Sequence, residues 1–186
     1  MFGIIKQFIS EDFFNKLKKE INFRKDDIVV NNSLIKEERQ TCWMSDLNYK
    51  YKYGNKTMNA DELTPIVKKI QKIIESKYGK YFDSLLINYY SNGNIGMRYH
   101  SDETYGEWEE DTVVVSFGST RKLVFREISN YENKTYFEVS SGDLIYMKEG
   151  CQQIYQHRVL KDKKNNKDRI SLVFKKHKIL NSLIYI

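Results

Sequence analysis

Two segments in the first half of the chain place apolar residues at helical spacing. The first covers residues 13–21, and Ser10 stands where the N-cap of that helix is expected. The second begins at Thr64 and Pro65, a pair typical of an N-cap and a first helical position. An apolar stripe at helical spacing follows Pro65, and it ends at Gly79, a residue type that readily ends a helix. The pattern therefore predicts two amphipathic helices in this half of the chain.

From about Leu85 onward, short apolar runs alternate with turn residues. LLINYY is followed by a polar turn at residues 91–94, and LIYM follows the Gly-Asp pair at 142–143. The runs TVVVSF and KLVFRE flank the Gly-Ser-Thr segment 118–120, which predicts a β-hairpin. RISLVFK, residues 169–175, closes the series. Helices followed by many short strands predict an α+β fold, mainly β, with helices packed on antiparallel sheets as in a jelly roll.

The chain is expected to form a single domain over residues 1–186. It has no internal repeat or low-complexity linker and contains one proline. Within this domain the supporting helices fall in about residues 1–84 and the jelly-roll strands in about residues 85–186. Periodicity alone leaves open whether the strands form a sandwich or a barrel.

The composition excludes several classes of protein. Hydrophobic residues make up 40% and charged residues 30% of the chain, a balance typical of a globular protein rather than a disordered one. No run approaches the ~20 apolar residues that span a bilayer, and Glu11 and Asp12 interrupt the apolar start too early for a signal peptide. Cys42 and Cys151 are then interpreted as reduced thiols of an intracellular protein, cytoplasmic or nuclear.

The charge balance is basic, with a net charge of +6 and a pI near 9.1. This is compatible with a polyanionic partner such as a nucleic acid, but it identifies none. A lysine-rich solvated surface explains the same numbers equally well. Charge alone therefore leaves the function open.

The histidines supply the first candidate chemistry. His100 is followed two positions later by Asp102, and on an extended chain such side chains point to the same face, so both can reach one metal ion. His157, which lies beyond further strands, can supply a third ligand when the sheet folds back. Two imidazoles and one carboxylate form the facial triad of iron(II) oxygenases, although a His-x-Asp pair alone also arises by chance. For His177, a hydrogen-bonded or surface imidazole is the favoured interpretation.

In the last apolar run, polar and apolar positions alternate. One face carries Arg169, Ser171, Val173 and Lys175, and the other carries Ile170, Leu172 and Phe174. A cation beside a metal site suits a dicarboxylate co-substrate, because Arg holds a carboxylate by two parallel hydrogen bonds. Taken alone, the pattern equally describes a half-buried strand whose charges face solvent.

These motifs follow one another in a specific order. The order is Asn88-x-Tyr90, His100-x-Asp102, SFGSTRKLVFRE, Gly142-Asp143-Leu-Ile-Tyr-Met, His157-Arg-Val and Arg169-x-Ser-x-Val-x-Lys. In this order the chain resembles the AlkB family of Fe(II) and 2-oxoglutarate-dependent dioxygenases, and most closely the branch that repairs alkylated bases. The likeness covers residues from about 85 to 176, with a weaker part at about 39 to 54.

The resemblance implies a double-stranded β-helix with supporting N-terminal helices and a nucleotide lid on the N-terminal side. It implies that His100, Asp102 and His157 bind Fe(II), with 2-oxoglutarate and O2 as co-substrates. The residues expected to bind 2-oxoglutarate are Asn88, Tyr90, Arg169, Ser171 and Lys175. The residues expected to contact the substrate are Tyr51, Tyr53, Trp43, Thr104 and Arg121.

The implied activity is oxidative dealkylation of N-alkylated bases in DNA or RNA, such as 1-methyladenine and 3-methylcytosine. Formaldehyde, succinate and CO2 are the products. Because the target atom must reach the iron, the base must leave the stack or already be single-stranded. The resemblance implies a lid of aromatic rings that would hold the base by stacking, which contributes ~1–3 kcal/mol per base.

Three positions depart from the family pattern. Lys175 replaces the final arginine of the closing motif and offers a point charge rather than a planar fork, so we expect weaker binding of 2-oxoglutarate. Thr104 stands where repair relatives carry an acidic residue, so the preferred lesion is expected to differ. Residues 29–32 provide no aromatic wedge of the kind that duplex-active relatives insert. We therefore expect the protein to favour single-stranded DNA or RNA over a duplex. We also expect it to be a monomer.

Two other interpretations remain open at this point. The same oxygenase chemistry could act on a protein side chain or a small molecule, because a fold and a cofactor do not fix the substrate. A nucleic-acid-binding module with an inactive metal site is the third, and the presence of all three metal-ligand candidates together with Arg169 argues against it.

Overall fold

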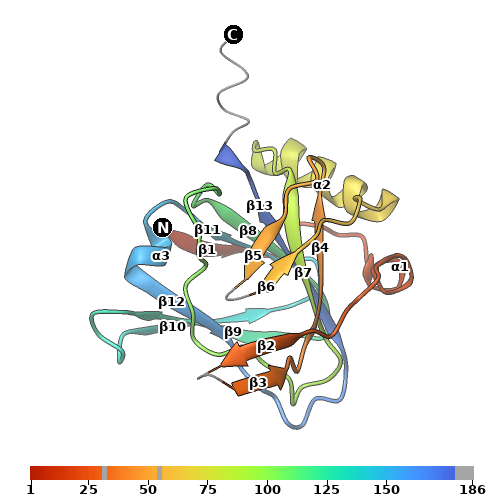
Figure 1. Ribbon diagram of the computed structural model, residues 1–186. Coiled ribbons are helices and arrows are strands. Elements are labelled where there is room, and N and C mark those ends of the chain that lie inside the picture. Colours follow the sequence, from red (N-terminus) through yellow and green to blue (C-terminus); the bar gives the residue numbers. More distant parts are fainter. Residues whose placement is uncertain (31–32, 54–55, 179–186) are drawn as a thin grey trace.

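Two facing β-sheets form the centre of the molecule (Figure 1). The computed structural model describes residues 1–30, 33–53 and 56–178. Within these residues the major sheet has the strand order β1-β11-β8-β13-β7-β4, and the minor sheet has the order β10-β9-β12. The major sheet consists of β1 (Phe2–Ile5), β4 (Gln40–Ser45), β7 (Ser84–Tyr90), β8 (Thr112–Gly118), β11 (Leu144–Met147) and β13 (Arg169–Lys175). The minor sheet consists of β9 (Arg121–Glu127), β10 (Lys134–Val139) and β12 (Tyr155–Val159). The pairings within both sheets are antiparallel, which confirms the predicted jelly roll.

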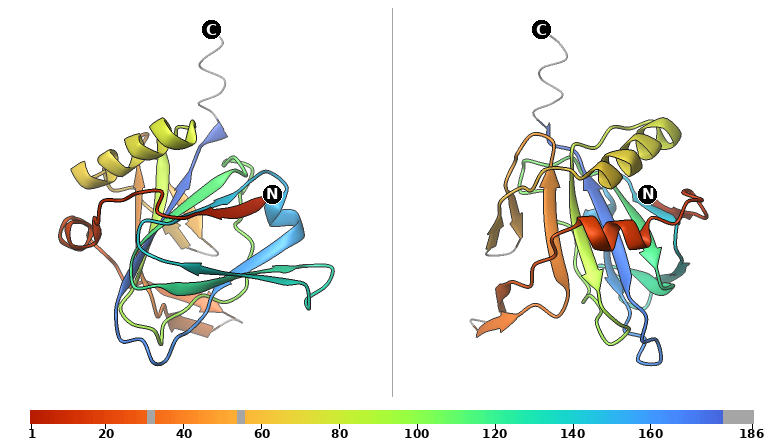
Figure 2. Two further views of the ribbon diagram at one scale, coloured as in Figure 1. Left: turned by 180° about the vertical axis from the view of Figure 1, so that it is seen from behind. Right: turned by 90° about the vertical axis from the view of Figure 1, so that its right-hand side faces the viewer.

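The helices α1 (Phe14–Glu20) and α2 (Pro65–Tyr78) cover the side of the major sheet that faces away from the minor sheet (Figure 2). Their apolar residues pack with the outward-facing residues of β7, β8 and β13 in one buried cluster. In α2 the predicted boundaries are confirmed, because the Thr64 hydroxyl accepts from the backbone N–H of Val67 and Gly79 adopts a left-handed φ of 78°. A third helix, α3 (Cys151–Ile154), is a single short turn before β12.

The predicted N-cap of α1 is wrong. Phe13 occupies the N-cap position, and the first backbone N–H, that of Phe14, donates to Asp12 Oδ1 at 3.0 Å. Ser10 therefore lies outside the helix. Asp and Ser are both favoured near helix N-termini, and the sequence places one of each within a few positions.

The predicted hairpin at residues 118–120 is also wrong. β8 pairs with β11 and β13, whereas β9 pairs with β10 and β12, so the chain crosses from the major to the minor sheet at this point. Gly118 makes the crossing with a φ of 88°, a left-handed conformation that glycine adopts without a steric penalty. The backbone N–H of Ser119 then donates to the Asp168 carbonyl at 2.9 Å, which fixes the crossing beside the start of β13.

A second buried cluster fills one end of the space between the sheets. It joins Phe125 of the minor sheet to Ile145 and Met147 of the major sheet, with Phe2 stacked on Phe125 at a centroid distance of 4.1 Å. The remaining space between the sheets is a cavity that both polar and apolar side chains line. The two sheets therefore meet through apolar contacts at one end and leave the other end available for a site.

Two small hairpins precede α2 in the chain and lie beside the two sheets (Figure 1). They are β2 (Asp27–Val30) with β3 (Ser33–Lys36), and β5 (Tyr51–Tyr53) with β6 (Lys56–Met58). The sequence pattern predicted helices in this half but not these strands, since each is only three or four residues long. None of the helices in the described residues has the length and apolar character needed to cross a membrane.

Candidate active site

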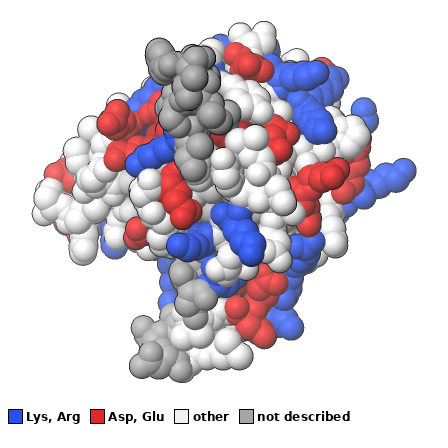
Figure 3. All heavy atoms as spheres, turned by 45° about the horizontal axis from the view of Figure 1, so that its top comes forward, with Lys and Arg blue, Asp and Glu red and all other residues white. Residues whose placement is uncertain are grey.

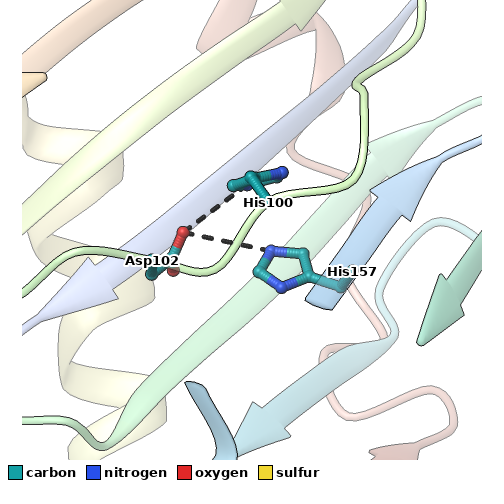
Figure 4. Close-up of side chains that lie close together, drawn as sticks. All are labelled: His100, Asp102 and His157. Carbon is teal, nitrogen blue, oxygen red and sulfur yellow. Dashed lines mark ion pairs between the residues drawn. The ribbon is translucent and has the colours of Figure 1, made fainter. Parts of the chain in front are cut away.

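The predicted metal ligands meet between the two sheets. His100 and His157 form a short antiparallel bridge, in which each backbone N–H donates to the other's carbonyl at 3.1 and 2.9 Å. Asp102 lies beyond this bridge, and both imidazoles point toward its carboxylate (Figure 4). The Nε2 atoms of His100 and His157 are 3.6 and 3.9 Å from Asp102 Oδ1, and one ligand atom from each residue lies within 4.8 Å of the others. The geometry therefore presents three convergent donors to one point.

The surroundings of Asp102 and His157 shift their pKa values toward the protonation states that bind a cation. Burial alone would raise the pKa of Asp102, but the positive charge of Lys175, followed by the two imidazoles, lowers it below the usual range. Burial, followed by repulsion from His100, lowers the pKa of His157 to about 3. At neutral pH the site thus holds a carboxylate and a neutral imidazole, the protonation states that metal ligands require.

Neighbouring groups hold the ligands in place. His100 Nδ1 lies 2.9 Å from the Arg98 carbonyl and donates its proton there, while Nε2 faces Asp102. The backbone N–H of Asp102 donates to the Gln152 side chain at 2.9 Å. His157 Nδ1 is buried and has no hydrogen-bond partner among the described residues.

Arg169 lies at the inner end of the same cavity. Its side chain is buried, and Nη2 donates to the Ser116 hydroxyl at 2.6 Å, while Nε and Nη1 have no partner among the described residues. Burial lowers the pKa of this guanidinium, which means that an isolated cation is costly here. Buried guanidinium donors without a partner are suited to bind the carboxylate of a ligand. The alternative that Arg169 faces solvent is wrong.

The other residues predicted to bind 2-oxoglutarate line this cavity too. They are Asn88, Tyr90, Ser171 and Lys175. Lys175 is buried, with Nζ 3.4 Å from Asp102 Oδ2, and it therefore contacts a metal-ligand candidate directly. Asn88 accepts a hydrogen bond from Arg39 Nε at 2.8 Å. The Arg169 guanidinium lies 5.3 Å from the centre of the Tyr90 ring.

The predicted substrate contacts divide into two groups. Tyr51 lines the cavity and stacks on Trp43 at a centroid distance of 4.3 Å. Trp43 is fully buried and does not line the cavity, so its predicted contact with the substrate is wrong. It packs against Tyr51 and Trp108 instead. The side chain of Tyr53 lies outside the described residues.

Two further predicted contacts also differ from expectation. The Arg121 guanidinium is buried and donates to the carbonyls of Asn92, Gly93, Ile95 and Leu160 at 2.6 to 3.3 Å. Arg121 therefore joins two loops instead of facing a substrate. Thr104 does not line the cavity, and its carbonyl accepts from the backbone N–H groups of Glu107 and Trp108 in the turn after Asp102.

Sequence reasoning missed residues that complete the site. Ser116 holds Arg169, Gln152 holds Asp102, and Arg39 reaches Asn88 from the loop between β3 and β4. No local pattern marks these residues, because each acts on a partner from a distant element. His177 is buried and stacks on Tyr49 at 3.9 Å, away from the metal-ligand candidates, as expected of a structural imidazole.

Comparison with known proteins identifies the class. The family model described as the 2OG-Fe(II) oxygenase superfamily matches residues 2–175, and the chain belongs to this superfamily. The donor set and the unpaired buried donors of Arg169 fit that assignment, since the superfamily uses Fe(II), 2-oxoglutarate and O2. Within it the chain is AlkB-like, as its sequence relatives indicate.

Three relatives illustrate the likeness. "Uncharacterized protein R406" of Acanthamoeba polyphaga mimivirus is 35% identical, with 92% of this chain and 91% of that protein covered. "Alpha-ketoglutarate-dependent dioxygenase alkB homolog 3" is 26% identical in Bos taurus, covering 89% of this chain, and 29% identical in Homo sapiens, covering 75%. The chain spans 61% of the bovine and 51% of the human protein.

Solved structures show the same fold. The structure of OsALKBH1 superposes with a TM-score of 0.63 and 15% identity, covering 95% of this chain and 96% of that one. A 2OG-Fe(II) oxygenase family oxidoreductase from Burkholderia pseudomallei superposes with a TM-score of 0.59 and 12% identity, covering 94% and 84%. At such identities the likeness concerns the fold alone.

Proposed function

We propose that this dioxygenase oxidatively removes alkyl groups from bases such as 1-methyladenine and 3-methylcytosine in single-stranded DNA or RNA. The observation that carries the proposal is that Tyr51 lines the same cavity as His100, Asp102 and His157. An aromatic ring in a cavity of that kind provides a stacking surface for a base beside the metal ligands. The names of the alkB homolog 3 relatives support the same activity.

In this proposal His100, Asp102 and His157 hold Fe(II), which with 2-oxoglutarate and O2 supplies the oxidation of the N-alkyl carbon. Arg169 binds the distal carboxylate of 2-oxoglutarate through buried guanidinium donors that have no partner among the described residues. Asn88, Tyr90, Ser171 and Lys175 line the rest of the co-substrate space. Lys175 also keeps Asp102 ionised, because its positive charge lies 3.4 Å from the carboxylate.

An outer groove provides a path to the cavity. It is lined by residues that include Arg98, Arg158, Lys161 and the hairpin residue Ile35. Arg39, Met97 and Val159 line both the groove and the inner cavity, so the two spaces adjoin. A flexible single strand can follow such a path more easily than a duplex, and the sequence at residues 29–32 contains no aromatic residue that could act as a wedge to open a duplex.

The test is demethylation of a single-stranded oligonucleotide that carries 1-methyladenine or 3-methylcytosine, with Fe(II), ascorbate and 2-oxoglutarate present. We expect the oligonucleotide to lose the mass of one methylene unit, and we expect His100→Ala to abolish this loss. Succinate formation without a mass change would contradict the proposal and would favour a protein or small-molecule substrate. A faster rate on the matching duplex would contradict the single-strand preference.

A further inference from the structure

A group of cations lies on the outer face of the minor sheet, on the side opposite the cavity. The strand register places Val124 and Arg126 of β9 opposite Arg158 and Gln156 of β12. Because side chains alternate along a strand, these residues share one face, while Phe125 and His157 point inward. Both guanidinium groups therefore lie on the face of the minor sheet opposite to the face that presents His157.

Aromatic rings hold these guanidinium groups in a fixed arrangement. The Arg126 guanidinium lies 3.8 Å from the ring centre of Tyr99 and 4.1 Å from that of Tyr131, and so lies against two rings. Its Nε and Nη2 donate to Gln156 Oε1 at 3.1 and 2.8 Å, which leaves Nη1 without a partner among the described residues. The Arg158 guanidinium lies 4.7 Å from the same Tyr99 ring. Stacking and hydrogen bonding thus fix the positions of two adjacent cations.

These two cations lack a counter-charge. Among the described residues no Asp or Glu forms an ion pair with Arg126 or Arg158, and Arg158 Nε is buried without a hydrogen-bond partner. The other half-buried cations in the described part of the chain are paired, as Lys80 is with Glu109 and Asp111. On the face drawn in Figure 3, lysines and arginines likewise lie among carboxylates. Glu37 and Glu38 line the same groove as Arg158, but they pair with other cations, namely Arg39, Lys56 and Lys161. Arg126 and Arg158 therefore remain able to bind an external anion.

Arg158 and the Tyr99 ring that it contacts are direct chain neighbours of two metal-ligand candidates. Tyr99 directly precedes His100, and Arg158 directly follows His157, and the two histidines are joined by reciprocal backbone hydrogen bonds. Consecutive Cα atoms are about 3.8 Å apart, so an anion held at Tyr99 and Arg158 lies close to the metal-ligand bridge. Arg158 also lines the outer groove that adjoins the cavity.

We infer that Arg126, Arg158 and Tyr99 bind a backbone phosphate of a single-stranded nucleic acid next to the nucleotide that enters the cavity. This inference rests on the proposed function, since it names a contact of the same substrate. A planar guanidinium presents paired donors to a phosphate, which a lysine does not. Tyr131, in the turn before β10, is 52% exposed, and Tyr136, on β10, is 60% exposed, so part of each ring can contact a neighbouring base.

The proposal is tested with an unmodified single-stranded oligonucleotide, whose binding is followed by fluorescence anisotropy over a range of salt concentrations. We expect Arg126→Gln and Arg158→Gln each to weaken binding by about tenfold, since a hydrogen bond to a charged group contributes ~1.5–3 kcal/mol. Each variant should also reduce the slope of log affinity against log salt by about 0.7. Arg158→Lys should retain most of the slope, because it preserves the charge.

Lys72→Gln is the matched control. It removes the same charge from an exposed position on α2, the helix that covers the opposite side of the major sheet, and it should leave affinity and slope unchanged. A thermal melt of each variant separates loss of the site from loss of the fold. Parental affinity and slope in both correctly folded arginine variants would overturn the proposal.

Two further outcomes separate this inference from the proposed function. The oligonucleotide carries no lesion, so arginine-dependent binding by a protein that fails to demethylate would support the phosphate site and contradict the proposed activity. Displacement of the oligonucleotide by a polyglutamate peptide at equal charge concentration would assign the surface to an acidic protein partner and overturn the phosphate assignment.

Discussion

The unpaired donors of Arg169 lead to a quantitative prediction for the binding of 2-oxoglutarate. Arg169→Met removes Nε and Nη1, the two buried donors that have no partner among the described residues. Each hydrogen bond to a charged group contributes ~1.5–3 kcal/mol, so their loss costs at least about 3 kcal/mol of binding free energy. Since ~1.4 kcal/mol corresponds to a tenfold change, the dissociation constant should rise by roughly 100-fold or more.

The same substitution should not weaken the fold. A buried cation without a counter-ion is costly, and its replacement by an apolar side chain of similar volume is often neutral or stabilising. We therefore expect the Met variant to melt at or above the temperature of the parent in the absence of ligand. Arg169→Lys keeps the charge but loses the planar fork, and we expect an intermediate effect of about tenfold.

The assay is anaerobic calorimetric titration of 2-oxoglutarate into Fe(II)-loaded protein, with a thermal melt of each variant beforehand. The reasoning would be refuted by a dissociation constant of the Met variant within about threefold of the parental value, because the free donors would then contribute less than ~0.7 kcal/mol. A large drop in the melting temperature of the Met variant would also refute it, because the guanidinium would then be a structural group.

Three other substitutions test further parts of the structure. Lys175→Arg should bind 2-oxoglutarate more tightly by up to roughly tenfold, because a fork adds a charged hydrogen bond, and equal affinities in the same titration would contradict this. Leu172→Ala in the fully buried face of β13 should lower the free energy of unfolding by ~2–5 kcal/mol, measured as a lower urea midpoint at constant m-value. Gly118→Ala should destabilise the protein more than Gly79→Ala does, because both have a positive φ but only the Cβ at 118 would lie 2.6 Å from the Asp168 carbonyl oxygen. Equal urea midpoints for the two glycine variants would exclude that clash.

The alternation in residues 169–175 shows what a local pattern can and cannot predict. It correctly separated Ile170 and Leu172, which pack under the helices, from Arg169 and Lys175 on the other face. It could not tell whether that second face meets water or a cavity, because periodicity records only which side chains share a face. The burial of both cations depends on the minor sheet, which comes from other parts of the chain.

The crossing at residues 118–120 illustrates a second limit. A glycine-containing turn between two apolar runs is compatible both with a hairpin and with a change of sheet. The choice depends on partners far away in sequence, since β8 pairs with β13 and β9 pairs with β12. The role of Arg121 could not be predicted for the same reason, because the four carbonyls that its guanidinium binds belong to distant loops at residues 92–95 and at 160.

The backbone bridge between His100 and His157 fixes the position of the metal-ligand candidates relative to the proposed phosphate site, because Tyr99 and Arg158 are their direct neighbours in the chain. Alternation across this bridge directs the imidazoles into the cavity and sends Arg158 to the outer face, where it meets the Tyr99 ring. A shift of β12 by one residue would turn every side chain to the opposite face, so it would remove His157 from the metal-ligand candidates and Arg158 from the groove together. Loss of one site without the other therefore requires a change of side chain, as in Arg158→Gln, and not a change of register. This separation is what allows oligonucleotide binding and metal binding to be tested independently in this fold.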